Sequence, residues 1–206
     1  MILDLGRRSY TDCWKEQKRL VDQRVAGTIN DTLVFVEHDP VYTAGTSARE
    51  KRHNSLPHPL HSVERGGDIT YHGPGQLVGY PILHLKERGL LVGSLLRSLE
   101  DTLIDTVAHY GLKGRAIEGK TGVWVGDKKI ASIGIAVRGW VSYHGFALNA
   151  DCDLAPFGAI RPCGFDAEVM SSLSELTGQH ITVNDLKPIV RSAFDKRFKE
   201  TTLCSQ

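Results

Sequence analysis

Apolar residues recur along the chain in two spacings, one typical of helices and one typical of strands. The clearest helical spacing runs from Val92 to Tyr110, where one apolar stripe is followed by Gly111 as a helix stop. Weaker patterns of the same kind predict helices over residues 9–24, 169–176 and 184–198. In the last of these, Pro188 is compatible with a helix only in the first turn, because proline has no backbone N–H to donate.

Strand patterns occupy the stretches between these helices. They predict strands over residues 32–38, 76–85, 123–125, 129–137 and 140–149. Over 129–137 both alternating sets of side chains are apolar or small, which indicates a strand covered on both faces and central in its sheet. Helices combined with an antiparallel meander predict one α/β (mixed α+β) domain over residues 1–206, rather than a doubly wound sheet.

The composition excludes several classes of protein. With 41% hydrophobic and 24% charged residues, the chain can bury one sizeable core, and no apolar run approaches the roughly 18 residues of a membrane span. The first residues lack the order of a signal peptide, so we expect a cytoplasmic protein. A formal net charge of +1 argues against a nucleic-acid partner, although local basic clusters are either solvated faces or docking sites for an acidic partner.

Cysteine and histidine spacings do not predict a metal centre. The four cysteines, at positions 13, 152, 163 and 204, form no CxxC pair, and we expect free thiols in a reducing compartment. Three histidines fall between residues 47 and 63, but prolines interrupt their spacing. We therefore interpret this stretch as a long loop rather than a metal site.

Two segments carry the residues best suited to chemistry. The first, from Arg65 to Gln76, holds four glycines and a proline among polar residues, so its backbone can approach a ligand closely. The second is Arg161-Pro162-Cys163-Gly164, where Cys163 on a predicted turn is either a nucleophile or a small buried thiol. Neither segment resembles a core element, and the first matches neither a P-loop nor a dinucleotide fingerprint.

A nucleophilic cysteine needs an activating neighbour, because only about 3% of an unperturbed thiol is ionised at pH 7. Lys129 is a candidate, since it opens the strand over 129–137, where Ala131 and Ile133 on the same face are apolar. We expect its ammonium to be partly desolvated and Lys128 to point the other way. The alternative is a solvated hairpin lysine.

Small residues on neighbouring strands predict a groove beside these groups. They are Ser132, Gly134, Gly145 and Ala147. An apolar groove that ends at a thiol suits an acyl chain delivered as a thioester. His72 and His144, each followed by glycine, are candidate general bases or hydrogen-bonded packing residues, and we interpret both as lining the groove.

A series of spaced motifs extends over nearly the whole chain. The motifs are Leu33 to His38 with Pro40 and Thr43-Ala44-Gly45, Arg65 to Gln76, Gly122 to Val125, Lys129 to Gly134, His144 to Asn149, and Pro162-Cys163-Gly164. With these motifs in this order, the chain resembles the lipoyl(octanoyl) transferase family, the octanoyl-[acyl-carrier-protein]:protein N-octanoyltransferases of lipoate biosynthesis. Arg161 and the loop over 46–63 depart from the family's pattern, which bears on fine substrate preference.

The resemblance implies a fold similar to the catalytic domain of biotin and lipoate protein ligases, with a central mixed sheet flanked by helices. It implies that Cys163 carries the acyl group as a thioester, while Lys129 lowers the pKa of that thiol and transfers protons. The substrate-contacting residues that it implies are Arg65, Gly66, Gly67, Asp68, Ile69, Thr70, Tyr71, His72, Ser132, Ile133, Gly134, Gly145, Phe146 and Ala147.

The resemblance also implies the reaction. An octanoyl group passes from octanoyl-acyl carrier protein to Cys163, and then to a lysine of a lipoyl domain of a 2-oxoacid dehydrogenase E2 subunit or of the glycine-cleavage H protein. We expect no ATP, metal or other cofactor, and no nucleic-acid or membrane partner. The alternatives are an ATP-dependent ligase and a non-catalytic binding module; the presence of both Cys163 and Lys129 argues against them.

Overall fold

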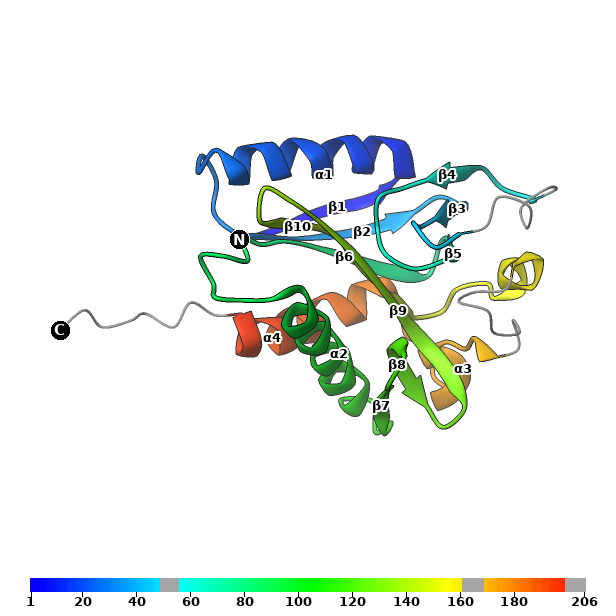
Figure 1. Cartoon of the computed structure of the whole chain (residues 1–206). Helices are drawn as coiled ribbons and strands as arrows, with labels where there is room; N and C mark the ends of the chain where they lie inside the picture. The colour runs from blue at the N-terminus through cyan, green and yellow to red at the C-terminus, as the bar shows by residue number, and fades with distance from the viewer. Residues whose placement is uncertain (49–55, 161–168, 199–206) are drawn as a thin grey trace.

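The strands form two sheets, and the larger one crosses the middle of the molecule (Figure 1). The computed structural model describes residues 1–48, 56–160 and 169–198. The larger sheet consists of β1 (Ile2–Arg8), β2 (Thr32–His38), β6 (Gln76–Ile82), β7 (Gly114–Ile117), β8 (Lys120–Val125), β9 (Lys128–Arg138) and β10 (Val141–Asn149), and the smaller one of β3 (Val41–Ala44), β4 (Leu60–Ser62) and β5 (Ile69–His72). Within the described ranges their spatial orders are β1-β2-β6-β10-β9-β8-β7 and β4-β3-β5.

The larger sheet is mixed and covered on both faces. β1 pairs in parallel with β2, whereas all other pairs of neighbouring strands in this sheet are antiparallel. The helix α1 (Tyr10–Val25) lies along one face, and α2 (Val92–Ala108) and α4 (Val183–Phe198) pack on the other (Figure 1). This arrangement confirms the predicted α/β fold with a central mixed sheet flanked by helices.

The continuous apolar run of β2 follows from this two-sided cover. Leu33 and Phe35 belong to the core that includes α2 and α4, and Val34 and Val36 belong to the core beneath α1. Successive side chains of a strand point to opposite faces, so a strand covered twice needs apolar residues at every position. The strand predicted over 32–38 is confirmed with the same bounds.

The strand predicted to be central is interior but is not the most buried one. β9 lies between β8 and β10, and Ile130 is fully buried, but Val137 near its end is 38% exposed. β10 is buried over its whole length and occupies the middle position of the sheet. Alternation within one strand reveals how that strand is covered, whereas its place in a sheet depends on pairing partners far away in sequence.

Polar caps set the ends of the predicted helices. The Ser9 hydroxyl accepts a hydrogen bond of 3.2 Å from the Asp12 N–H, which starts α1 close to the predicted residue 9. The helix predicted over 169–176 is shorter: α3 (Leu173–Thr177) starts after Ser172, whose hydroxyl accepts from the Glu175 N–H. The prediction that it begins at 169 is wrong, because Met170 instead forms a β-bridge with Lys129.

Pro188 lies deeper in its helix than we expected. α4 begins at Val183, so Pro188 is its sixth residue and lies beyond the first turn. The carbonyl that a donor at this position would bind belongs to Asn184, and both residues are exposed. Water can therefore hydrate that carbonyl, which explains why the missing N–H is tolerated.

The apolar pattern missed the short strands of both sheets. The prediction that residues 65–76 contain no core element is wrong, because β5 lies within them and Ile69 and Tyr71 are only 2% and 3% exposed. The predicted loop over 47–63 contains β4. Strands of three or four residues are too short to show a period. β4 and β5 are therefore defined only by their pairing with β3.

Candidate active site

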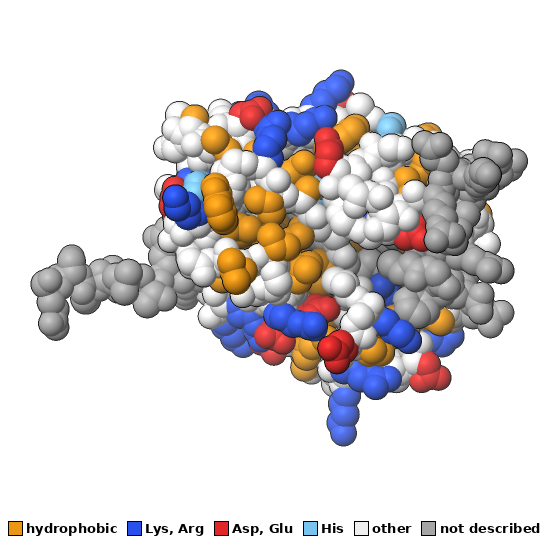
Figure 2. All heavy atoms as spheres, viewed as in Figure 1, with side chains coloured by type: hydrophobic (Ala, Val, Ile, Leu, Met, Phe, Trp, Pro, Cys, Tyr) orange, Lys and Arg blue, Asp and Glu red, His pale blue; other side chains and the backbone are white. Residues whose placement is uncertain are grey.

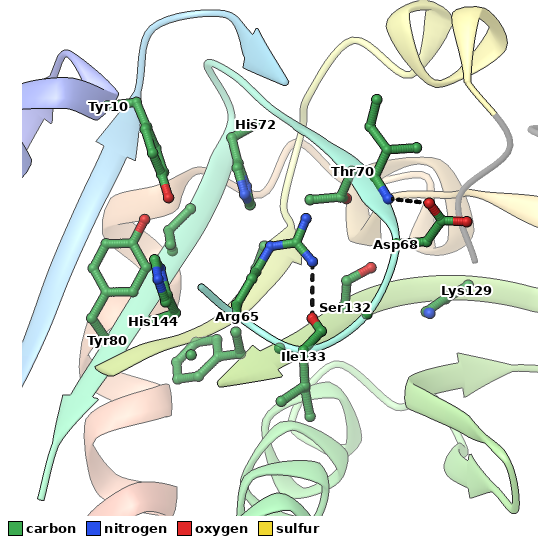
Figure 3. A pocket seen from close by; sticks show the side chains of 18 residues that line it. Tyr10, Arg65, Asp68, Thr70, His72, Tyr80, Lys129, Ser132, Ile133 and His144 are labelled. Carbon is green, nitrogen blue, oxygen red and sulfur yellow. Dashed lines mark hydrogen bonds between the residues drawn. The ribbon is translucent and has the colours of Figure 1, made fainter. Parts of the chain in front are cut away.

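A cavity of about 570 Å³, including the part open to solvent, lies where the glycine-rich segment covers β9 and β10 (Figure 3). The predicted residues that line it are Arg65, Gly66, Gly67, Asp68, Ile69, Thr70, His72, Lys129, Ser132, Ile133, Gly134, Gly145, Phe146 and Ala147. His144 lines it as well. The structure thus gathers three segments, far apart in sequence, around one space.

Tyr71 is the one predicted binding residue that does not line this cavity. Its ring packs edge-to-face on Phe157 of η2 (Ala155–Ala159), with ring centroids 5.5 Å apart, and also contacts Tyr42. Its neighbours in β5, Thr70 and His72, do line the cavity. Alternation along β5 therefore separates Tyr71 from the site.

Close backbone contact forms the wall of the cavity. Gly134 pairs with Gly145, and Ser132 pairs with Ala147, across β9 and β10. The Gly66 N–H donates to the carbonyl of Ile135 at 3.0 Å, and a Cβ on Gly134 would lie 2.8 Å from the Gly66 carbonyl oxygen. Only glycine allows the two chains to approach this closely. The predicted groove between the sheet and the glycine-rich segment is present.

A chain of hydrogen bonds runs below the cavity, and its direction can be assigned from one end. The Ser171 carbonyl can only accept, so the amide nitrogen of Asn149 donates to it at 2.8 Å. The Asn149 amide oxygen then accepts from the Gln76 side-chain nitrogen at 2.8 Å. The Gln76 amide oxygen is left to accept from Nδ1–H of His72 at 2.7 Å. His72 therefore carries its proton on Nδ1.

The other end of this chain of hydrogen bonds is the Arg65 guanidinium. With its proton on Nδ1, Nε2 of His72 is an acceptor, and the Thr43 hydroxyl lies 3.4 Å away. The Arg65 guanidinium donates to that hydroxyl at 3.0 Å, and to the Thr43 and Gly66 carbonyls at 2.7 and 3.1 Å. Burial lowers the pKa of His72 to about 3. His72 is thus neutral at pH 7, with both ring nitrogens engaged, and does not suit a general base.

Aromatic and imidazole side chains close one end of the cavity (Figure 3). The Tyr80 hydroxyl is 2.8 Å from Nε2 of His38, whose Nδ1 lies 3.1 Å from the Arg8 carbonyl. Burial lowers the pKa of His38 to about 4 and raises that of Tyr80 well above its usual range. Because the Arg8 carbonyl requires a donor, His38 carries its proton on Nδ1 and accepts from Tyr80.

His144 belongs to this closed end in an unusual backbone conformation. Its φ of 54° lies in the left-handed region, and its N–H donates to the Gln17 side-chain oxygen at 2.9 Å. Nε2 of His144 lies 3.4 Å from Glu64, and burial lowers the pKa of His144 to about 4. The strain at this residue is offset by two polar contacts that aim the ring at the cavity.

The sequence did not reveal Tyr10, Val78 and Tyr80 as lining residues. Val78 faces Ala147 across β6 and β10, and this pairing register brings it to the groove. Tyr10 arrives from the first residue of α1. No spacing within one segment encodes either contact, although the aromatic character of Tyr10 at a helix start was a weak signal.

Lys129 lies toward the opposite end of the cavity from Tyr80 (Figure 3). It is 2% exposed, and its ammonium lies 5.7 Å from the centre of the Trp124 ring. Lys128 is exposed on the other face. The expected desolvation of Lys129 and the opposite orientation of Lys128 are both confirmed, and the solvated hairpin alternative for Lys129 is excluded.

Two of the four cysteines lie within the described residues. Cys13 and Cys152 are buried free thiols, and burial raises the pKa of each to about 12. Neither suits a nucleophile near neutral pH. Cys163, together with Arg161, and Cys204 lie outside the described residues. The described chain resumes beside Lys129, because Met170 bridges to it and the Ser171 N–H donates to the Lys129 carbonyl at 3.0 Å.

The histidines of the loop over 47–63 pack against aromatic rings where the structure describes them. The ring of His61 stacks on Tyr10 at 5.6 Å, and that of His58 lies 6.1 Å from Tyr42. In the described ranges, no three potential ligands among His, Cys, Asp and Glu gather closely enough to hold a metal ion. In the same ranges, every helix is too short or too polar to cross a bilayer.

Known proteins match the chain over most of its length. A sequence model of the lipoyl protein ligase A/B catalytic domain matches residues 9–195. The octanoyltransferase of Syntrophotalea carbinolica is 45% identical over 198 residues, which cover 96% of this chain and 94% of that protein. The octanoyltransferase of Mycobacterium tuberculosis is 43% identical over 195 residues, which cover 93% of this chain and 84% of that protein.

Solved structures share the fold at low sequence identity. Lipoate-protein ligase A bound with ATP has a TM-score of 0.75 at 16% identity, covering 95% of this chain and 84% of that one. The biotin protein ligase from Aquifex aeolicus has a TM-score of 0.57 at 14% identity, covering 96% of this chain and 68% of that one. At these identities the likeness establishes the fold and not the chemistry.

The buried histidines predict acid sensitivity. The folded pKa values of His38, His72 and His144 lie at about 4, 3 and 4, below the unfolded value near 6.5, so the unfolded chain binds more protons below pH 6.5. The contribution of these neutral histidines to the free energy of unfolding is therefore fully present above pH 6.5. It is lost as the pH falls towards 4, by about 1.4 kcal/mol per pH unit for each histidine. Urea unfolding at several pH values measures this slope.

A matched pair of variants assigns the slope. His38→Gln removes one buried titrating group and should flatten the dependence, whereas the exposed-site variant His109→Gln should retain it. A free energy of unfolding that stays constant between pH 7 and pH 5 in the unsubstituted protein would contradict the assignment of neutral buried imidazoles.

Proposed function

Since the chain belongs to the lipoyl protein ligase A/B catalytic domain family, we propose that it moves an octanoyl group from octanoyl-acyl carrier protein, through a thioester on Cys163, to lysines of lipoyl domains. Octanoyl transfer in lipoate biosynthesis is its activity, because relatives 43–46% identical over most of both chains are octanoyltransferases. The observation that carries the proposed route is the buried Lys129 at one end of the cavity, beside the point where the described chain resumes after Cys163.

The groove accounts for the acyl group. Its walls are glycine and small or apolar residues of β9 and β10, and aromatic rings close the end away from Lys129. An eight-carbon chain inserted with its methyl end towards the aromatic rings places its thioester carbonyl near Lys129. Cys163 supplies the nucleophile, because the thiols of Cys13 and Cys152 are buried and held protonated.

In the first half-reaction the Cys163 thiolate attacks the thioester carbonyl of the donor. Backbone amides near the site stabilise the tetrahedral oxyanion. The bond to the phosphopantetheine sulfur breaks, and the Lys129 ammonium protonates the departing thiolate. The products are the octanoyl-enzyme, the free carrier thiol and a neutral Lys129 amine.

In the second half-reaction a neutral lysine amine of the acceptor attacks the octanoyl-enzyme. A C–N bond forms, the C–S bond to Cys163 breaks, and Lys129 accepts the proton that the amine loses. The Cys163 thiolate and the Lys129 ammonium are thereby restored. Conversion of a thioester into an amide is favourable without ATP, so neither ATP nor a metal ion enters the cycle.

The acceptors that we propose are lipoyl domains of 2-oxoacid dehydrogenase E2 subunits and the glycine-cleavage H protein. In each of them the group that receives the octanoyl chain is a lysine side chain, which has to reach the Lys129 end of the cavity. We place the reaction in the cytoplasm, since a nucleophilic thiol requires a reducing compartment.

Gly122 and Glu100 fix the space that Lys129 occupies. Gly122 has a φ of 127°, and a Cβ there would meet the Ala131 carbonyl oxygen and lie 2.8 Å from Cε of Lys129. Its N–H donates at 3.2 Å to the Glu100 carboxylate, which is buried in α2. With the Trp124 ring on the other side, the lysine stem is confined, so we assign Gly122 a positioning role.

The covalent intermediate is tested first. Incubation with octanoyl-acyl carrier protein and no ATP should add one octanoyl group, sensitive to hydroxylamine, to the protein and to no peptide other than that of Cys163, as intact-protein and peptide mass spectrometry will reveal. Cys163→Ser should abolish the adduct. An adduct on Cys13, Cys152 or Cys204, or a strict requirement for ATP, would refute the route.

The role of Lys129 is tested through the thiol. Lys129→Ala should slow both half-reactions by about 100-fold or more and move the pH profile of Cys163 alkylation by iodoacetamide upward by about one unit, because the neighbouring ammonium is lost. Lys128→Ala, on the opposite face, is the control and should behave as the unsubstituted protein. Equal transfer rates in Lys129→Ala and the unsubstituted protein would remove Lys129 from the mechanism.

The confinement of Lys129 is tested with two glycines of one hairpin. Gly122→Ala should lower the transfer rate by about 10-fold or more and raise the pH midpoint of Cys163 alkylation, since the added methyl displaces the lysine stem. Gly119→Ala also replaces a glycine of positive φ, at 74°, but its methyl group meets open space, so transfer should persist. If both variants lose the same activity, strain rather than lysine placement explains the effect.

A further inference from the structure

Exposed cations gather at the edge of the larger sheet next to Lys129. We call this surface the basic edge and define it by Lys113, Arg115 and Lys120, all exposed. Two carboxylates, Glu118 and Asp127, lie in the same stretch of β7, β8 and their turns. In Figure 2, Lys and Arg side chains are concentrated over β7 and β8, at the lower end of the molecule as Figure 1 orients it.

The register of three strands connects this edge to the cavity. Arg115 pairs with Trp124, and Trp124 pairs with Lys129, so the three side chains lie side by side on one face. The Lys120 ammonium is 5.6 Å from the centre of the Trp124 ring, and that of Lys129 is 5.7 Å from it. Positive charge therefore continues from the exposed Arg115 and Lys120 to the buried Lys129.

Basic clusters on α1 and α4 contain ion pairs. On α1, Arg19 forms an ion pair with Glu16 at 2.6 Å, and on α4, Arg197 pairs with Asp105 at 2.8 Å and Arg191 lies 3.8 Å from Asp195. These pairs reduce the field of each cluster. Arg115 of the basic edge instead donates to the Gly126 backbone carbonyl at 2.9 Å and keeps its charge available to a partner.

We propose that the basic edge is the docking surface for the acidic donor protein, with Arg115 and Lys120 receiving the phosphodiester of its acyl-bearing arm. This inference rests on the proposed function. The donor brings an anionic arm and an acidic surface, and both complement the edge. When the phosphodiester is held at Arg115 and Lys120, the rest of the arm passes Trp124, and the thioester at its end lies towards Lys129.

The test reverses two charges and compares donors. The double variant Arg115→Glu, Lys120→Glu should raise the apparent KM for octanoyl-acyl carrier protein by about 10-fold or more, since attraction becomes repulsion. The KM for S-octanoyl-N-acetylcysteamine, which has neither protein nor phosphate, should change by less than about twofold. The control Arg191→Glu, Lys196→Glu makes the same charge change on α4 and should alter neither KM.

A change of ionic strength supplies a second test of the docking surface. Raising salt from about 0.02 to 0.2 M should raise the carrier KM of the unsubstituted protein, because the attraction is screened, and should not raise that of the double variant, because there salt screens a repulsion. Octanoyl-4′-phosphopantetheine, whose phosphate is a monoester, separates the arm from the protein. A KM raised for it by the double variant supports phosphate binding at Arg115 and Lys120.

Three results would overturn the proposal. They are an unchanged carrier KM in the double variant, an equal loss with the small thioester, and a raised KM for the lipoyl-domain acceptor instead of the donor. If the unsubstituted protein forms no octanoyl-enzyme from either donor, the proposed thioester route fails. If both donors acylate it and the double variant keeps its carrier KM, the docking surface alone is wrong.

Discussion

The hydrogen-bond chain from Arg65 to the Ser171 carbonyl is the constraint on which the site depends. Arg65 can only donate and a backbone carbonyl can only accept, so every group between them has one permitted orientation. The chain joins β3, β5, β6 and β10 to the segment that follows Cys163. Each member is buried, and loss of one would leave its partner without a hydrogen bond, at a cost of about 1–3 kcal/mol. The two sheets are thereby held in one register around the cavity.

This register also determines which residues are available for proton transfer. His72 and His38 have both ring nitrogens within hydrogen-bonding distance of partners and are neutral at pH 7. Their role is to orient Thr43, Gln76 and Tyr80, and so to shape the cavity. Lys129 is different, because its side chain borders the cavity at the end away from Tyr80. The group that we propose for proton transfer is therefore spatially separated from the groups that hold the structure.

Prediction from sequence succeeded where a single segment contains the information. The opposite directions of Lys128 and Lys129 follow from strand alternation, and the groove follows from small residues at matching positions of adjacent strands. Prediction failed where the information lies in pairing between distant segments. Tyr80 reaches the cavity only because β6 lies next to β10, and Tyr71 leaves it only because β5 exists as a strand. The identity of β10 as the middle strand has the same cause.

The charges around the cavity favour one set of chemical steps. Arg65 and Lys129 place two cations on its walls and Asp68 places one carboxylate, while His72 and His144 add no charge at pH 7. In a space shielded from water, this field favours a thiolate over a thiol and an oxyanion over a carbonyl. The same field opposes an ammonium, so an acceptor lysine must lose its proton before it attacks. In the mechanism that we propose, the acceptor lysine therefore enters as a neutral amine, and Lys129, left neutral by the first half-reaction, accepts the proton that this amine loses as the C–N bond forms.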